Sequence, residues 1–233
     1  ELMLVQSKNA AMGEMISMIA HQWRQPITTM SMMANNILAD IELEIFEENT
    51  AKKFALELSE QTQYLSKTIE DFRNFFKQDK TTDETSLKMV FEETDSIISA
   101  SLKNNNIELI LNYDENIKIK TYKRELMQVL INIFKNSKEA FFDKNTENKY
   151  IKIDVLDNKE NVTMKICDNA GGIKKENLDK LFDAYFTTKE EQNGTGLGLY
   201  MCKMIVQKHL LGDITVCNIN NGAMFTLTLK KFT

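Results

Sequence analysis

Hydrophobic positions in the first third of the chain recur with the period of an α-helix. Between residues 12 and 41 they are separated by three or four residues, and similar spacing returns between residues 54 and 76. A polar break at Glu47–Thr50, with Thr50 as the N-cap, separates the two stripes. This pattern predicts two long helices that form a hairpin. The first stripe comprises Met12, Ile16, Ile19, Trp23, Ile27, Met30, Ala34, Ile37 and Ile41, and the second Phe54, Leu58, Leu65, Ile69, Phe72 and Phe76.

A hairpin of this kind needs a second copy of itself. Two helices alone bury too little apolar surface to be stable. Two hairpins would bury both stripes inside a four-helix bundle. We therefore expect a homodimer whose dimerisation domain is residues 1–79.

The pattern changes after a polar stretch that is typical of an interdomain linker. We place the linker at residues 80–86 and a second domain at residues 87–233. Helical periodicity at 87–102, 124–142 and 197–208 mixes there with short alternating strands, without regular βαβ order. The fold class predicted for the whole chain is α+β, a helical hairpin followed by an α/β sandwich. The strand patterns fall at 107–111, 117–119, 151–155, 162–166, 214–216 and 223–229.

Composition excludes several classes of protein. The 233 residues carry a formal net charge of −5, so we expect no nucleic-acid partner. No apolar run approaches the about 20 residues of a membrane span, which leaves open whether the intact protein is membrane-anchored. We expect the core itself to be cytoplasmic. The chain opens inside a helical pattern, and membrane contact is expected only through an absent upstream region. The three cysteines lie among apolar residues and form no Cys-x-x-Cys pair, which predicts buried free thiols.

His21 is the first candidate for chemistry. It lies two residues beyond Ile19, about 200° round the helix, and so projects away from the apolar seam. Pro26 removes a backbone donor five residues later and predicts a bend in the helix. An exposed histidine without a chemical role is the simpler interpretation of the residue alone. A loosened helix beside an exposed imidazole favours a functional one.

Asn132 and Asn136 are four residues apart on a predicted helix, so both amides share one face. Amide oxygens suit Mg²⁺, which keeps several waters and bridges substrate phosphates. Two solvated asparagines are the simpler alternative for this pair in isolation. The buried side of the helix is expected to comprise Leu126, Val129, Leu130, Ile133 and Phe134.

Two glycine-containing segments follow. Asp168 ends a predicted strand just before Gly171 and Gly172. Its carboxylate could accept a hydrogen bond from the exocyclic amino group of a base. A simple turn that binds no ligand has the same sequence pattern. The run Gly194–Leu199 opens a helix, where backbone N–H groups can converge on phosphate. It lacks the lysine of a P-loop and does not follow a strand as the dinucleotide-binding motif does.

In this order and spacing the motifs resemble those of the two-component sensor histidine kinases, over essentially the whole chain. His21–Pro26 is similar to the phosphoacceptor box H-x-x-R-x-P, and Leu130–Ala140 to the asparagine box. Asp168–Ile173 resembles the first glycine box. Leu181–Lys189 resembles the phenylalanine motif with its following Thr-Thr-Lys, and Gly194–Leu199 matches the second glycine box.

The resemblance implies a dimeric hairpin and an ATP-binding sandwich of the gyrase-like superfamily. It implies that His21 is phosphorylated from Mg·ATP and passes the phosphoryl group to an aspartate of a response regulator receiver domain. Gln22 and Arg24 are then expected to act beside His21. Asn136 is implied to hold Mg²⁺ and Asp168 to read adenine. The further nucleotide-binding residues implied are Asn132, Gly172, Thr187, Thr188, Lys189, Gly194, Thr195, Gly196, Leu197 and Gly198.

Some positions depart from the family pattern. Gln22 replaces the usual acidic residue after the histidine, and Gln25 replaces a Thr or Asn assigned to phosphatase activity. Ala170 replaces the first glycine of its box. Gln22 and Ala170 support an alternative, a nucleotide-binding signalling scaffold without transfer activity.

The asparagine box also departs from its relatives. Glu139 stands where many members have a lysine near phosphate, and either Lys135 or Lys138 could substitute for it. Related ATPases carry a water-activating glutamate at the position of Asn132. Its absence favours a kinase over an ATPase.

Overall fold

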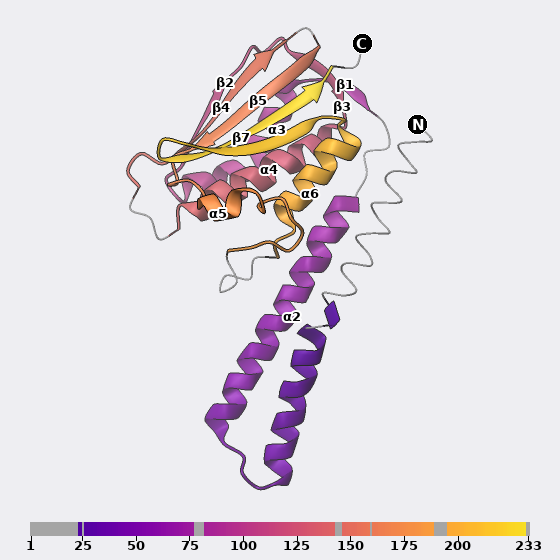
Figure 1. The fold of residues 1–233 in the computed structure, drawn as a ribbon, viewed down its shortest axis with the longest axis vertical. Helices are drawn as coiled ribbons and strands as arrows, with labels where there is room; N and C mark the ends of the chain where they lie inside the picture. The colour runs from indigo at the N-terminus through magenta and orange to yellow at the C-terminus, as the bar shows by residue number, and fades with distance from the viewer. Residues whose placement is uncertain are drawn as a thin grey trace. The chain divides into compact units, whose positions relative to one another are not determined.

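The computed structural model of the chain describes residues 23–24, 26–76, 82–142, 146–158, 160–188 and 195–231. They form two compact units, one built on a helical hairpin and one on an α/β sandwich (Figure 1). The sandwich unit comprises Lys77–Phe186 and Gly196–Thr233. In the described ranges no helix combines the length and hydropathy that a bilayer crossing requires.

The hairpin consists of a helix over residues 26–42 and α2 (Glu48–Phe76). Residues 43–47 connect them. Because α2 begins at Glu48, the N-cap expected at Thr50 is wrong. Thr50 lies inside the first turn, where its hydroxyl donates to the Glu47 carboxylate at 3.2 Å. The acidic Glu48 instead suits the positive end of the helix dipole.

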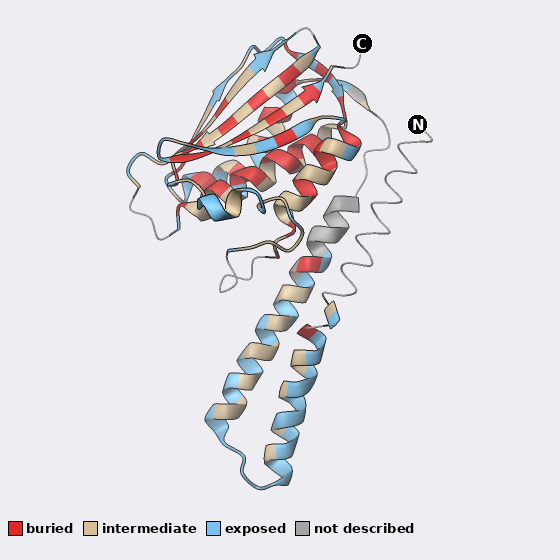
Figure 2. Ribbon diagram, viewed as in Figure 1, coloured by how far each residue is buried: buried red, intermediate tan, exposed pale blue. Residues whose placement is uncertain are grey.

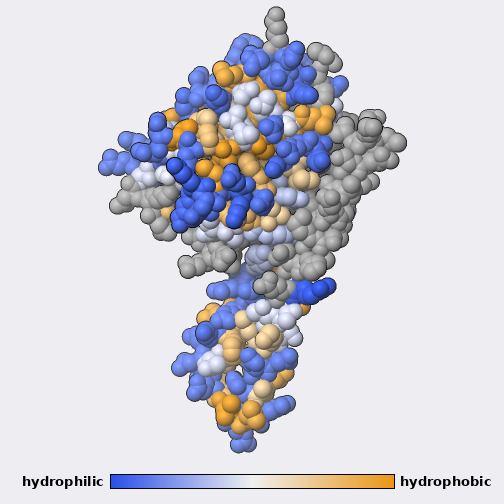
Figure 3. All heavy atoms as spheres, in the orientation of Figure 1, coloured by the Kyte–Doolittle hydropathy of each residue, from blue (hydrophilic) through white to orange (hydrophobic). Residues whose placement is uncertain are grey.

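Apolar side chains stay exposed along the hairpin, which is mostly pale blue and tan in Figure 2. Ile27, Ile41 and Ile69, all members of the predicted stripes, are 50%, 53% and 48% exposed. Orange residues also gather at the hairpin tip in Figure 3, where Leu43 and Phe46 are 67% and 50% exposed. A single chain therefore leaves the predicted seam uncovered.

Part of the expected linker belongs to the sandwich. Residues Asp83–Ser86 form strand β1, which pairs antiparallel with β3 (Lys118–Thr121). Four polar residues gave no strand signal, yet Thr85 is buried and Ser86 caps the next helix by accepting the Met89 N–H at 3.2 Å. The polar composition therefore concealed an edge strand, and a linker reaching residue 86 is too long.

The main sheet has five strands in the order β2-β4-β5-β7-β6. The β2–β4 pair is parallel and the other pairs are antiparallel. The expected strands are confirmed with small shifts of their ends. Their bounds are β2 Glu108–Asn112, β4 Tyr150–Asp157, β5 Asn161–Asp168, β6 Asp213–Ile219 and β7 Gly222–Lys230.

Alternating residues of the sheet pack against a layer of helices and form the core. The buried residues of both are red in Figure 2. On β5 the buried positions are Val162, Met164, Ile166 and Asp168. The helices are α3 (Leu87–Lys103), α4 (Lys123–Ala140), the short α5 (Lys175–Leu178) and α6 (Gly198–Met204), which continues as the π-helix η2 (Ile205–His209). The side of α4 expected to be buried is confirmed.

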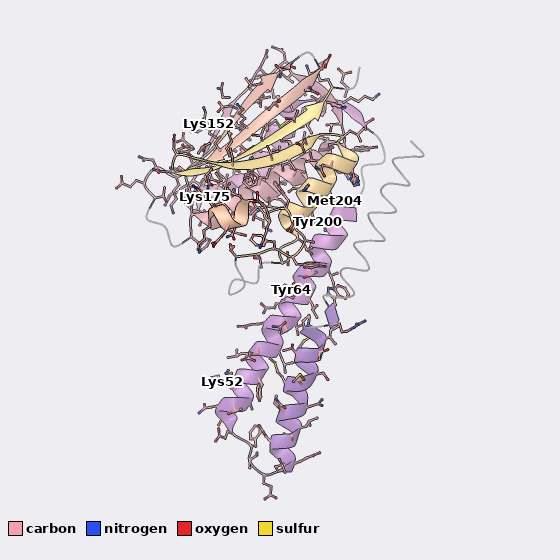
Figure 4. All side chains as sticks on the ribbon, viewed as in Figure 1. Lys52, Tyr64, Lys152, Lys175, Tyr200 and Met204 are labelled. Atoms are coloured by element: carbon pink, nitrogen blue, oxygen red, sulfur yellow. The ribbon has the colours of Figure 1, made fainter. Side chains whose placement is uncertain are left out.

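One side of α6 is only partly covered. The half-exposed Tyr200 and Met204 lie four residues apart on this helix (Figure 4).

All three cysteines are free, as expected, but burial was predicted for each and holds fully only for Cys202. Cys217 is exposed because it lies on the edge strand β6.

Candidate functional site

The carboxylate of Asp168 is buried at the end of β5 and points into the helix side of the sheet. It is in phase with Ile166, and only 4% of the residue is exposed. One oxygen, Oδ1, accepts the backbone N–H groups of Ala170 at 3.0 Å and Ala223 at 3.2 Å. The other, Oδ2, accepts the Ser137 hydroxyl at 2.9 Å. Strand phase therefore excludes the simple solvent-facing turn.

The first glycine box is fixed against the turn between β6 and β7. Gly171 and Gly172 have φ of 82° and 73°, a region that favours glycine. Asn218 of β6 accepts the Ile173 N–H at 2.8 Å and donates to the Ile173 carbonyl at 2.6 Å. A Cβ on Gly172 would lie 2.9 Å from Asn218 Oδ1. The loop beside Asp168 thus depends on a residue about fifty positions later.

The two amides of α4 have different partners. Asn136 Nδ2 donates to the Asn132 backbone carbonyl at 2.9 Å, which leaves Oδ1 as the atom able to bind a cation. The Asn132 side chain bonds to Cys202 of α6. Burial raises the pKa of the Cys202 thiol to about 12, although this hydrogen bond acts in the opposite direction. Cys202 is therefore a packing residue and not a nucleophile.

The second glycine box meets the phenylalanine motif through the backbone. The Tyr185 N–H donates to the Gly196 carbonyl at 3.0 Å, and both residues have positive φ, 65° and 63°. A Cβ on Gly196 would lie 2.3 Å from the Tyr185 carbonyl carbon, so glycine is required there. Gly198 opens α6, and nothing lies within 4 Å of a Cβ built on it.

The remaining nucleotide-binding candidates are in mixed surroundings. Leu197 is 1% exposed, so it can reach a ligand only through its backbone. Thr195 is buried, Thr187 is half-buried and Thr188 is exposed. Lys189 and Gly194 lie outside the described residues.

The phosphoacceptor box is described only in part. His21, Gln22 and Gln25 lie outside the described residues, so their predicted roles stay predictions. Arg24 is exposed, and its carbonyl accepts the Thr28 hydroxyl at 2.7 Å. Pro26 is buried at the start of the helix over 26–42.

The structure separates the two lysines that could substitute at the asparagine box. Lys138 Nζ donates to the Ser101 hydroxyl of α3 at 3.0 Å, so it faces α3. Lys135 is exposed one residue before Asn136. Lys135 is thus the better placed of the two.

The sequence interpretation missed three residues that support the site. Ser137 contacts Asp168 from α4, and a polar residue on an otherwise apolar helix side was the available signal. Asn218 and Gly222 come from the β6–β7 hairpin, and no local pattern connects them to Asp168. A Cβ on Gly222 would lie 1.6 Å from the Asp168 carbonyl oxygen.

Contacts from α4 bring the motifs together. Ser137 joins α4 to Asp168 of the first glycine box, and Asn132 joins it to α6 behind the second. The Tyr185–Gly196 bond adds the phenylalanine motif. Within the described residues no three His, Cys, Asp or Glu side chains form a metal cluster. A buried acceptor, amide oxygens and a glycine-bounded helix start are the features of a nucleotide-binding domain.

Comparisons with known proteins agree with this class. Residues 121–233 match the model of the histidine kinase-, DNA gyrase B- and HSP90-like ATPases, and residues 11–81 match the His Kinase A phosphoacceptor domain. The sensor protein KdpD of Clostridium acetobutylicum is 28% identical over 94% of this chain and 25% of its own length. The chain therefore spans about a quarter of that relative.

Solved structures of histidine kinases are also similar. The catalytic domain of histidine kinase ThkA matches with a TM-score of 0.58 and 29% identity, covering 64% of this chain and 95% of that one. ThkA in complex with the response regulator TrrA matches with a TM-score of 0.65 and 23% identity, covering 97% and 64%. The chain belongs to the two-component histidine kinases and comprises the core of one.

Proposed function

We propose that this chain transfers the γ-phosphoryl group of Mg·ATP to His21 and then to an aspartate of a response regulator receiver domain. The observation that carries the proposal is the buried Asp168 carboxylate, joined through Ser137 to the helix that bears Asn132 and Asn136. A carboxylate in that place accepts from the adenine amino group. The amide oxygens lie on the adjoining helix, where the phosphates and their metal would follow.

The residues present fit a magnesium ion carried by the nucleotide. Asn136 is half-buried and offers the oxygen Oδ1, and Mg²⁺ is an oxygen-binding cation that takes few protein ligands and relies on waters and substrate phosphates. When bound, such an ion would neutralise charge on the phosphates, and the protein would supply the positioning. Gly196 and Gly198 offer backbone N–H groups, and Thr187, Thr188, Lys189, Gly194 and Thr195 complete the proposed nucleotide contacts.

In the transfer step a ring nitrogen of neutral His21 forms a bond to the γ-phosphorus as the bond to the β–γ bridging oxygen breaks. ADP leaves, and the ring releases its proton. An unperturbed histidine pKa of about 6.5 keeps most of the imidazole neutral above pH 7. We expect Gln22 to act beside the ring and Arg24 to orient the phosphate. In the second step the phosphoryl group moves from nitrogen to a receiver carboxylate oxygen.

Asn132 favours transfer over hydrolysis. An amide cannot take a proton from water, whereas a glutamate at this position could. Bound ATP is then preserved until His21 reaches it. Asn132 lies close enough to Cys202 for a hydrogen bond, which holds the amide in place.

The functional unit is a homodimer. Ile27, Ile41 and Ile69 are about half exposed in one chain although they lie on the predicted apolar stripes. Burying apolar surface yields about 25 cal/mol per Å², so covering these stripes with a second hairpin is strongly favourable. The ThkA complex with TrrA supports a receiver domain as the second partner.

The decisive experiment uses labelled ATP and scores acid-labile, base-stable phosphate on the protein. His21→Ala should abolish this label while leaving ATP affinity nearly unchanged. The chain has two histidines, so His209→Gln is a matched control. His209 is buried with Nδ1 2.8 Å from Glu125 Oε2, and this variant should keep the label.

The same experiment tests the alternative scaffold function. A scaffold would bind ATP and acquire no acid-labile label in the wild-type chain. Label that persists in His21→Ala would place the phosphoacceptor elsewhere and contradict the proposal.

A further inference from the structure

Ser137 places a hydroxyl on the apolar side of α4. It follows Ile133 by four residues and Leu130 by seven, and both are fully buried. The serine itself is 3% exposed. A buried hydroxyl costs free energy unless it is hydrogen-bonded, and an alanine would fill this position without that cost. Packing alone therefore does not explain the hydroxyl. Its hydrogen-bond partner is Asp168 Oδ2, at 2.9 Å.

The two oxygens of Asp168 are held by different kinds of donor. Oδ1 accepts two backbone N–H groups, from Ala170 and Ala223, which are fixed by the loop and by β7. Oδ2 accepts the side-chain hydroxyl of Ser137. Rotation about the bond between Cβ and Cγ would move both oxygens away from these donors. The Ser137 hydroxyl opposes that rotation and fixes the direction in which Oδ2 can accept a further donor.

We propose that Ser137 is a positioning residue that makes the site selective for a purine with an amino group at C6. The inference rests on the proposed role of Asp168 in reading the base. Adenine presents an N–H donor to Oδ2, whereas hypoxanthine presents a carbonyl oxygen at the same position. Two acceptors repel each other. A fixed Oδ2 cannot turn away from the carbonyl, and a loosely held one can.

The test compares ATP with inosine triphosphate, whose bases differ at C6 and the adjoining N1. Dissociation constants for both are measured by displacement of trinitrophenyl-ATP. Ser137→Ala should raise the dissociation constant of ATP about three- to tenfold and change that of inosine triphosphate little. The preference for ATP should therefore fall by a similar factor. The matched control is Ser101→Ala, which removes a hydroxyl of α3 that is bonded to Lys138 and should leave the preference unchanged.

Two further variants keep the outcome decisive. Ser137→Thr retains the hydroxyl and should retain the preference, and thermal unfolding without nucleotide checks that each variant is folded. If Asp168→Asn removes the preference while Ser137→Ala behaves as Ser101→Ala, Ser137 is only structural and the inference is overturned. If Asp168→Asn leaves the preference intact, Asp168 does not read the base, and the proposed site assignment falls with the inference.

Discussion

The sandwich buries its apolar residues within one chain, and the hairpin leaves many of its own exposed. Leu87, Leu126 and Leu130 of the sandwich are fully buried within one chain. Ile27 and Ile41 of the hairpin are half exposed although they lie on a regular apolar stripe. The sandwich therefore satisfies its own hydrophobic pattern, and the hairpin does not. We therefore expect one chain to complete the nucleotide site and the hairpin to need a second copy for a stable bundle.

The largest expected effect breaks the self-sufficient core. Leu130→Ala should lower the free energy of unfolding of the sandwich by about 2–5 kcal/mol because it leaves a cavity beneath α4. The loss should not depend on protein concentration in urea unfolding followed by circular dichroism. The control Leu56→Ala changes a residue that is 59% exposed on α2 and should cost about 0.5 kcal/mol or less. Equal losses in both variants would refute the contrast.

The next prediction concerns the seam. Ile27→Glu should raise the dimer dissociation constant at least about 100-fold, because a carboxylate replaces about 2–3 kcal/mol of apolar burial. Sedimentation across a range of concentrations measures this. Ile97→Glu is the matched control, since Ile97 is 58% exposed on α3 of the sandwich. If the dimer persists in Ile27→Glu, or if Ile97→Glu weakens it to the same extent, the stripe does not form the interface.

A smaller effect is expected at the loop beside Asp168. Asn218→Ala removes both hydrogen bonds to the backbone of Ile173 and should weaken ATP binding about three- to tenfold. Asn112→Ala is the control, because that amide donates to Asp154 at 3.0 Å on the far edge of the sheet. Isothermal titration with ATP distinguishes the two. If the two variants bind ATP with equal affinity, the loop beside Asp168 keeps its conformation without Asn218.

The smallest effect is expected beside the phosphoacceptor. Gln22→Glu should raise the initial autophosphorylation rate about fivefold, since a carboxylate stabilises the charged ring by about 1 kcal/mol more than an amide oxygen. ATP affinity should stay the same, and Gln22→Met provides a control without an acceptor. A rate that stays level or falls with Gln22→Glu would place Gln22 away from the ring nitrogen, or give it a donor role toward phosphate.

Local pattern was enough to predict most of the elements and motifs. Alternation placed β4, β5 and β7, and periodicity placed α3 and α4, because each has one buried face. Strand β1 was missed since Asp83–Ser86 is polar and is defined by its pairing with β3. The bonds from Ser137 and Asn218 were also missed. They join residues 31 and 45 positions apart, and only the folded sheet brings these together.

One glycine limits how this domain can vary through mutation. Gly222 opens β7 where the strand passes the Asp168 carbonyl oxygen, and a Cβ there would lie 1.6 Å from that atom. Its φ is not in the left-handed region, so the constraint is space and not conformation. A substitution at Gly222 would displace the strand that supplies the Ala223 N–H to Asp168. We therefore expect a side-chain change at the exposed Asn221 of the same turn to be tolerated, whereas any side chain at Gly222 would displace the Asp168 carboxylate.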